Sequence, residues 1–232
     1  MIQYIDTPLF GVGISILVYT FSSYISGRLR IKILNPLLLT MIIIVGILLL
    51  LRIDYDIYNK GGQIISFFLG PATVVLAVPL YKQINLLKEN LLPILTGILV
   101  GSISGIISIL GLGKLFNLDL ILISSLIPKS TTTPIAMEIS TILGGNSSLT
   151  VTFVVITGLS GYIIGEKVLE IVGIKEPIAK GIALGTASHA IGTAKAIEMG
   201  EVEGAMSSLS IGVAGIITVF LVPLIIWLIG II

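Results

Sequence analysis

The chain of 232 residues has no cysteine, a single histidine and few charged side chains. Without cysteine it can form no disulfide, thiolate zinc site or iron–sulfur cluster, and it has no thiol nucleophile. A single histidine provides no metal-binding pair, so we expect neither a metal site nor a bound cofactor. A net charge of +1 leaves no basic face that could neutralise a nucleic-acid backbone.

Charged residues make up only 11% of the chain, and hydrophobic residues make up 55%. Because soluble domains carry about 25% charged residues, a soluble protein of this composition could not cover its surface. The 26 glycines also favour a membrane protein, since glycine lets transmembrane helices pack closely. The composition predicts an all-α, polytopic transmembrane bundle in the plasma membrane. We expect it to form a homo-oligomer through its glycine-rich helices.

Charge-free runs long enough to cross the hydrocarbon core, which takes about 20 residues, lie at 7–27, 33–51, 61–81, 90–113, 139–165 and 204–232. The connectors between the runs are short and polar, so none can form a soluble domain. Asp6 precedes the first run and Arg28 follows it, which favours a retained helix over a cleaved signal peptide. The runs predict a single membrane domain over 1–232, with two N-terminal spans in 1–60 and a core in 61–232.

Three segments rich in glycine, proline and hydroxyl side chains interrupt the core, at 69–73, 127–134 and 185–193. A glycine followed by a proline ends a helix in the first segment. In the second segment Thr133 is the predicted N-cap of a short helix that begins at Pro134 and stops at Gly144. After the third segment we predict another short helix over 194–199. The sequence therefore predicts discontinuous helices at membrane depth.

The distribution of Lys and Arg residues bears on the topology of 120–143. If this segment crosses the membrane, the basic residues of the connectors divide almost evenly between the two sides. If it is a re-entrant hairpin, most of them lie on one side, as the positive-inside rule requires. We therefore favour the hairpin, and the topology of 177–199 stays open. The similar spacing of the three breaks is either an internal repeat, which many transporters have, or a coincidence.

Hydroxyl and ionisable side chains gather in the breaks. Broken backbone in a membrane is stable only where protein or water satisfies its polar groups, and an ionisable residue there is functional by default. Helices that restart at Pro134 and Thr193 would aim their positive N-terminal ends into a common cavity. We therefore predict a binding site for a small organic anion lined by Lys129, Ser130, Thr131, Thr132, Thr133, Ser188, His189, Thr193 and Thr73.

Each ionisable residue also has a plainer interpretation. Lys129 could extend its charged end to the membrane interface, and His189 could satisfy the broken backbone instead of relaying a proton. Glu138 could couple protons, balance Lys129 or face the headgroups. Lys195 and Glu198 lie three residues apart on a helix and are expected to form a structural ion pair. Coupling to either H⁺ or Na⁺ is compatible with this set of residues.

Three motifs resemble those of the LrgB/CidB family: LGPATVVLAVPLY at 69–81, PKSTTTPIAM at 128–137 and GTASHAIGTA at 185–194. The resemblance covers roughly residues 60–225, and Thr131 stands where the family pattern has valine. The resemblance implies an antiholin-like, autolysis-modulating membrane protein that acts with a small holin-like partner of the LrgA/CidA type. It also implies a relation to a plastidial glycolate/glycerate translocator.

The sequence is compatible with three functions to different degrees. The first is a secondary transporter of short monocarboxylates such as glycolate, glycerate or pyruvate, with a cavity formed by broken helices. The alternative is a holin-like or antiholin-like regulator that changes membrane permeability and murein hydrolase activity. The third is an intramembrane enzyme, which the absence of GxSxG and HExxH signatures disfavours. The hydroxyl-rich breaks favour the transporter, because a pore former has no need of them.

Overall fold

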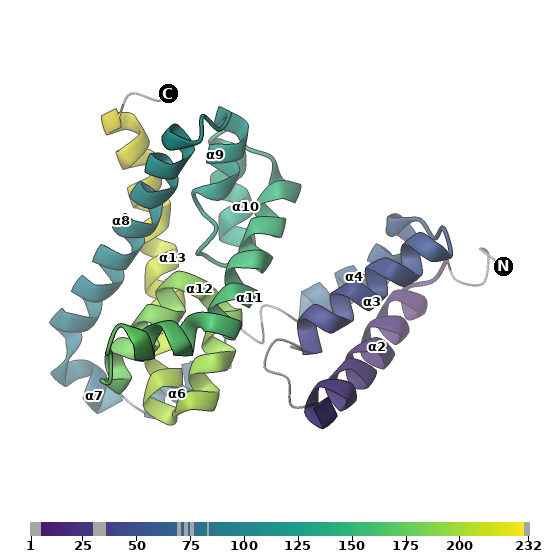
Figure 1. Cartoon of the computed structure of the whole chain (residues 1–232), viewed down its shortest axis with the longest axis horizontal. Coiled ribbons are helices and arrows are strands. Elements are labelled where there is room, and N and C mark those ends of the chain that lie inside the picture. Colours follow the sequence, from purple (N-terminus) through teal and green to yellow (C-terminus); the bar gives the residue numbers. More distant parts are fainter. Residues whose placement is uncertain are drawn as a thin grey trace. The chain divides into compact units, whose positions relative to one another are not determined.

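The computed structural model describes residues 6–29, 36–68, 71, 74, 77–82 and 84–229. The described residues form α-helices joined by turns, which confirms the predicted all-α class. Their contacts divide the chain into two compact units, Met1–Val75 and Leu76–Ile232 (Figure 1). The single membrane domain over 1–232 stays a prediction.

The first unit consists of α2 (Pro8–Leu29), α3 (Pro36–Leu50) and α4 (Tyr55–Phe67). Helices α2 and α4 approach so closely that a Cβ atom on Gly61 would collide with the backbone of Pro8 and Val12. Helix α4 begins six residues before the apolar run predicted at 61–81, because Asp54 provides the extended residue that precedes its first turn. The predicted break at 69–73 lies outside the described residues, apart from Pro71.

The second unit carries the candidate site. Its described elements are α6 (Ala77–Lys82), α7 (Ile84–Glu89), α8 (Leu91–Leu115), α9 (Leu120–Leu126), α10 (Thr133–Ile142), α11 (Ser147–Ile171), α12 (Pro177–Met199) and α13 (Glu201–Ile229). Helices α8, α11 and α13, together with α2 of the first unit, are long and apolar enough to cross a membrane. The 25 residues of α8 span roughly 37 Å, which exceeds a hydrocarbon core of about 30 Å.

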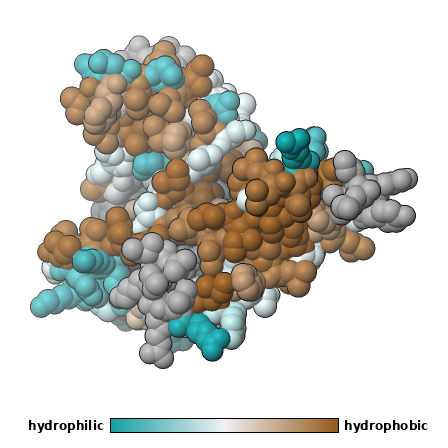
Figure 2. All heavy atoms as spheres, turned by 45° about the vertical axis from the view of Figure 1, so that its right-hand side comes forward, coloured by the Kyte–Doolittle hydropathy of each residue, from teal (hydrophilic) through white to brown (hydrophobic). Residues whose placement is uncertain are grey.

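Large apolar side chains on these helices point outward. Leu92 of α8, Ile142 of α10 and Phe220 of α13 are each more than two-thirds exposed. Figure 2 shows hydrophobic residues over most of the visible face, with hydrophilic residues in small separate groups. A surface of this kind needs lipid as its solvent, so the chain is a multi-pass membrane protein.

The first hairpin consists of α9, the turn at 127–132 and α10. The carboxylate of Asp119 accepts a hydrogen bond from the Leu122 amide at 2.7 Å and so caps the start of α9. The amide of Asn146 donates to Ser125 Oγ at 2.8 Å, so the chain leaving α10 returns to the side of α9. Segment 120–143 therefore has the hairpin form that the charge distribution favours.

The N-terminus of α10 differs by one residue from the prediction. Thr132 is the N-cap, with extended backbone, and Thr133 is already helical, so Pro134 occupies the second position of the helix. Proline is tolerated there because its missing N–H would have no helical partner. Gly144, at φ 72°, follows the helix in the left-handed conformation that ends helices, at the position that the sequence predicts.

The second hairpin is α12 itself. Its helical backbone is interrupted at Ser188 (φ −139°, ψ 18°) and His189 (φ 40°, ψ −140°). A Cβ atom on Gly192 would lie 2.9 Å from the carbonyl oxygen of Leu184, although residues eight apart in a straight helix are separated by about 12 Å. The chain therefore doubles back at 188–189. The helix resumes at Ala190, earlier than the predicted restart at 193–194.

The first hairpin lies along the C-terminal half of α8. At the open end of the hairpin, where α9 begins, a Cβ atom on Gly113 of α8 would lie 2.8 Å from Ile123 Cδ1. At its tip, a Cβ atom on Gly105 would lie 3.9 Å from Ser130 Oγ. The hairpin thus enters at the C-terminal end of α8 and reaches the middle of that helix.

The second hairpin lies along the N-terminal half of α8. A Cβ atom on Gly97 would lie 3.5 Å from Ile182 Cγ2, and one on Gly101 would lie 3.0 Å from Thr186 Cγ2. The two hairpins therefore enter from opposite ends of α8, and their tips meet halfway along it. Because α8 is long enough to span the bilayer, the meeting point lies at membrane depth.

Each hairpin is followed by a long helix, α11 after the first and α13 after the second. Helix α11 starts beside Ser125 of the first hairpin, and a Cβ atom on its Gly165 would lie 2.6 Å from Leu184 of the second. Helix α13 starts near the second hairpin, and its Ile226 lies in the apolar cluster that contains Ile139 of the first. The unit of hairpin plus long helix thus occurs twice with opposite direction, as in transporters with inverted repeats.

Candidate functional site

A groove of about 690 Å³ lies between α8 and the first arm of α12. Gly97, Gly101 and Gly105 line it on α8, where α12 and the hairpin tip come close to the helix backbone. Ile178 and Ile182 line it from α12, and the first hairpin contributes two residues of its tip. The groove has the size of ordinary small-molecule sites, which occupy about 300–1,000 Å³.

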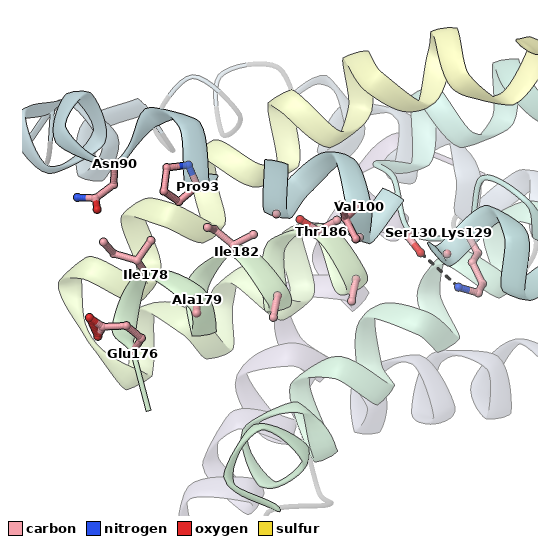
Figure 3. A pocket seen from close by; sticks show the side chains of 15 residues that line it. Asn90, Pro93, Val100, Lys129, Ser130, Glu176, Ile178, Ala179, Ile182 and Thr186 are labelled. Carbon is pink, nitrogen blue, oxygen red and sulfur yellow. Dashed lines mark hydrogen bonds between the residues drawn. The ribbon is translucent and has the colours of Figure 1, made fainter. Parts of the chain in front are cut away.

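The two ends of the groove differ in chemistry. Figure 3 shows Asn90 and Glu176 at one end and Ser130 with Lys129 at the other. Between them the walls are mostly apolar, and Thr186 is a polar exception near the Lys129 end. The groove therefore has an acidic end, an apolar middle and a basic end.

Lys129 provides the positive charge at the basic end. It lies in the tip of the first hairpin, where the Thr131 amide donates to the Pro128 carbonyl at 3.0 Å and closes the turn. Its Nζ donates to Ser130 Oγ at 3.2 Å. Among the described residues, which include every Asp and Glu of the chain, no carboxylate forms an ion pair with Lys129. A partly buried cation without a carboxylate partner is a natural site for an anionic ligand.

A second, much smaller cavity of about 20 Å³ adjoins the basic end. Ser130 and Thr186 line both spaces. The small cavity also takes Ser102 from α8, Thr131 from the hairpin tip and Thr218 from α13. Helix α8, the first hairpin, α12 and α13 thus each contribute at least one hydroxyl group to this small cavity. We call it the hydroxyl cavity.

The predicted site residues are only partly brought together. Lys129 and Ser130 line the groove, and Ser130 and Thr131 line the hydroxyl cavity. Thr132 and Thr133 line neither, because they form the N-terminus of α10. Thr73 lies outside the described residues.

The residues of the second tip serve as anchors. His189 is 4% exposed, and its Nε2 lies 2.9 Å from the carbonyl oxygen of Val154 in α11. A carbonyl only accepts, so this ring nitrogen carries the proton. Thr193 donates to the His189 carbonyl at 3.0 Å and shares a 2.7 Å hydrogen bond with Ser207. Ser188, His189 and Thr193 line neither cavity.

The other ionisable candidates lie away from the groove. Glu138 is exposed on α10 and forms no ion pair with Lys129. Lys195 lies 3.6 Å from Glu198 and only 2.8 Å from Glu166 of α11. Tyr162 donates to Glu198 at 2.6 Å. These four side chains fasten the second arm of α12 to α11.

Sequence reasoning missed Ser102, Thr186 and Thr218. Thr186 belongs to the GTASHAIGTA motif, and Ser102 follows Gly101 of the glycine series on α8. Membership in the motif and proximity to the glycine series were the sequence signals that could have identified Thr186 and Ser102. Nothing in the sequence relates Thr218 to the other two.

The comparisons with known proteins agree on one family. A model of the LrgB-like family matches residues 15–228. The Bacillus subtilis (strain 168) protein YxaC is 42% identical over 222 residues, which is 94% of this chain and 96% of that protein. The antiholin-like protein LrgB of Bacillus cereus (strain B4264) is 39% identical over 225 residues, covering 97% of this chain and 98% of that protein. A Bacillus anthracis antiholin-like protein LrgB matches to the same extent.

No solved structure matches the chain significantly. The arrangement of the two hairpins therefore rests on the contacts described above. The family match covers both units and all three motifs that resemble the LrgB/CidB pattern. On this agreement between motifs, relatives and membrane fold, the chain belongs to the LrgB-like family.

Proposed function

We propose that this chain is an antiholin-like regulator of membrane permeability and murein hydrolase activity, and that it acts by moving small organic monocarboxylates across the bilayer. The first half of the proposal is supported by relatives named antiholin-like, which are 39% identical over nearly the whole chain. The second half is supported by the site. In this proposal the flux of an organic acid is the cause, and the change in cell-wall hydrolysis follows from it.

One observation carries the transport half. Two hairpins that enter from opposite ends of α8 bring Lys129, a cation with no carboxylate partner among the described residues, to the end of a groove. Discontinuous elements that meet midway across the membrane are the usual place of substrate sites in secondary transporters. A regulator that acts only by opening a pore needs apolar helices and no such site.

The proposal extends to coupling and assembly. A gradient of H⁺ or Na⁺ would drive the acid, and a small holin-like partner or further copies of the chain would complete the assembly. No enzymatic step is part of the proposal.

The test is uptake of radiolabelled glycolate, lactate and pyruvate into proteoliposomes that contain the full-length protein, under H⁺ or Na⁺ gradients. Lys129→Gln should lower saturable uptake at least about tenfold, because a charge-assisted contact to the anion is lost. Lys175→Gln is the matched control, since Lys175 is an exposed lysine of the α11–α12 connector. Its uptake should equal that of the wild type.

Two results would contradict parts of the proposal. Undiminished saturable uptake by Lys129→Gln would show that Lys129 does not bind the substrate. Leakage of unrelated dyes without saturable uptake of any acid would rule out transport. The permeability-regulating function would then stand alone.

A further inference from the structure

The hydroxyl cavity contains two hydroxyl groups with no hydrogen-bond partner among the described residues. Ser102 and Thr186 are 8% and 7% exposed, and neither Ser102 Oγ nor Thr186 Oγ1 is bonded. Helical Ser and Thr residues ordinarily donate to the carbonyl four residues earlier, as Thr218 does to Ala214 at 2.7 Å. Two buried hydroxyl groups left free in one small cavity are costly to the fold. They therefore point to a ligand.

The hydrogen-bonding capacity of the lining residues selects the charge of that ligand. Thr131 donates to Pro128 and Thr218 donates to Ala214, so both protons are already engaged. The protons of Ser102, Thr186 and Ser130 remain available, since Ser130 accepts from Lys129. Available donors at the boundary with an ammonium group suit an anion. A metal cation would be repelled by Lys129.

The size of the cavity limits what can enter it. A volume of about 20 Å³ is enough for one water-sized group. A whole carboxylate is larger than this, but one of its oxygens would fit. Because Ser130 lines both spaces, the second oxygen would lie in the groove on the side of Lys129.

We propose that the hydroxyl cavity and Lys129 together bind the carboxylate of a monocarboxylate whose apolar tail lies along the groove. One carboxylate oxygen accepts from Ser102 and Thr186, and the other accepts from Lys129. This assignment rests on the proposed transport function and adds to it the position of the head group and a preference for an apolar tail.

The rest of the groove decides the substrate class. Beyond Thr186 its walls are formed by glycine, alanine, valine, isoleucine and proline residues, which match a hydrocarbon tail. A second carboxylate would lie against these apolar walls without a hydrogen-bonding or cationic partner, and Glu176 at the far end provides none. Monocarboxylates with a short apolar tail, such as butyrate, should therefore bind better than glycolate, and dicarboxylates such as succinate should bind worst.

The first experiment measures binding of radiolabelled butyrate, glycolate and succinate to the full-length protein in lipid nanodiscs. Ser102→Ala and Thr186→Val should each raise the Kd for butyrate about tenfold, because each removes one donor to a charged acceptor. Ser108→Ala is the matched control, since Ser108 is exposed on the same helix and donates to Gly105. It should leave the Kd unchanged.

A second measurement separates a ligand site from a structural role. Removing an unbonded buried hydroxyl group does not weaken the ligand-free fold, so the Tm of Ser102→Ala without ligand should equal or exceed that of the wild type. A purely structural hydroxyl would give a lower Tm. Weaker binding together with an unchanged or higher Tm is therefore the result expected here.

The outcomes distinguish this inference from the proposed function. If wild-type uptake is saturable but Ser102→Ala and Thr186→Val bind butyrate normally, the cavity holds only water, and the head-group assignment is overturned while transport stands. If succinate binds as tightly as butyrate, the direction of the tail is wrong. If the wild-type protein neither binds nor transports any monocarboxylate, the head-group assignment and the transport half of the proposed function both fail.

Discussion

The two hairpins reach the same depth from opposite ends of α8, yet their tips are built differently. The tip of the first is a turn of six residues, 127–132, that carries a lysine and opens into the groove. The tip of the second is two residues, Ser188 and His189, buried against α11. The contacts of the second tip therefore support the fold, whereas the first tip is the one that binds a ligand in the proposed function.

The largest loss of stability is expected from a substitution at Gly161, against which the second tip packs. A Cβ atom on Gly161 of α11 would collide with the Ser188 side chain, so Gly161→Ala should destabilise the protein by about 3 kcal/mol, the upper end of overpacking effects. A Cβ atom on Gly105 would lie 3.9 Å from Ser130 Oγ of the first tip, which is an ordinary contact, so Gly105→Ala is the control. Thermal unfolding in detergent compares the two variants. Equal Tm values for the two variants would show that the two tips are packed equally tightly against their neighbouring helices.

Removal of the histidine anchor should have the next largest effect. His189 holds φ 40°, which costs a non-glycine residue about 1–3 kcal/mol, and its bond to Val154 helps to hold it there. His189→Ala should lower stability by about 2 kcal/mol through the lost hydrogen bond and the space left in the tip. Binding of butyrate to the folded fraction should be unchanged. A normal Tm with lost binding would instead make His189 a ligand residue.

The smallest effect is expected from the hydrogen bond between Thr193 and Ser207. Thr193→Val keeps the shape of the side chain and removes its hydroxyl group, so stability should fall by about 1 kcal/mol. Hydrogen exchange of the amides at 190–199 should report this change as faster opening of the second arm. Exchange that is accelerated equally at 133–142 would show that the two hairpins open together.

The sequence predicted the first hairpin more accurately than the second. Pro128, Pro134 and Gly144 mark its turn and the limits of α10, because each acts through local backbone geometry. In the second hairpin the glycines do not mark the position of the turn. Gly185 and Gly192 flank the break but serve close packing, and the chain turns at two residues that carry side chains.

The candidate site could be predicted only in part for a related reason. Lys129 and Ser130 belong to one segment, so their proximity follows from the chain. The hydroxyl cavity joins residues from α8, both hairpins and α13, which lie up to 116 positions apart, and only tertiary packing brings them together. The same limit applies to His189, whose acceptor Val154 lies on another helix.

Helix α13 contacts both hairpins. Near its start it lies so close to α12 that a Cβ atom on Gly185 would lie 2.8 Å from Ser210 Cβ, and a Cβ atom on its Gly215 would lie 2.9 Å from Ile135 of α10. It follows both hairpins in the chain, so they leave the ribosome before their common support exists. The two hairpins therefore stay incompletely packed until α13 has been synthesised and has entered the membrane.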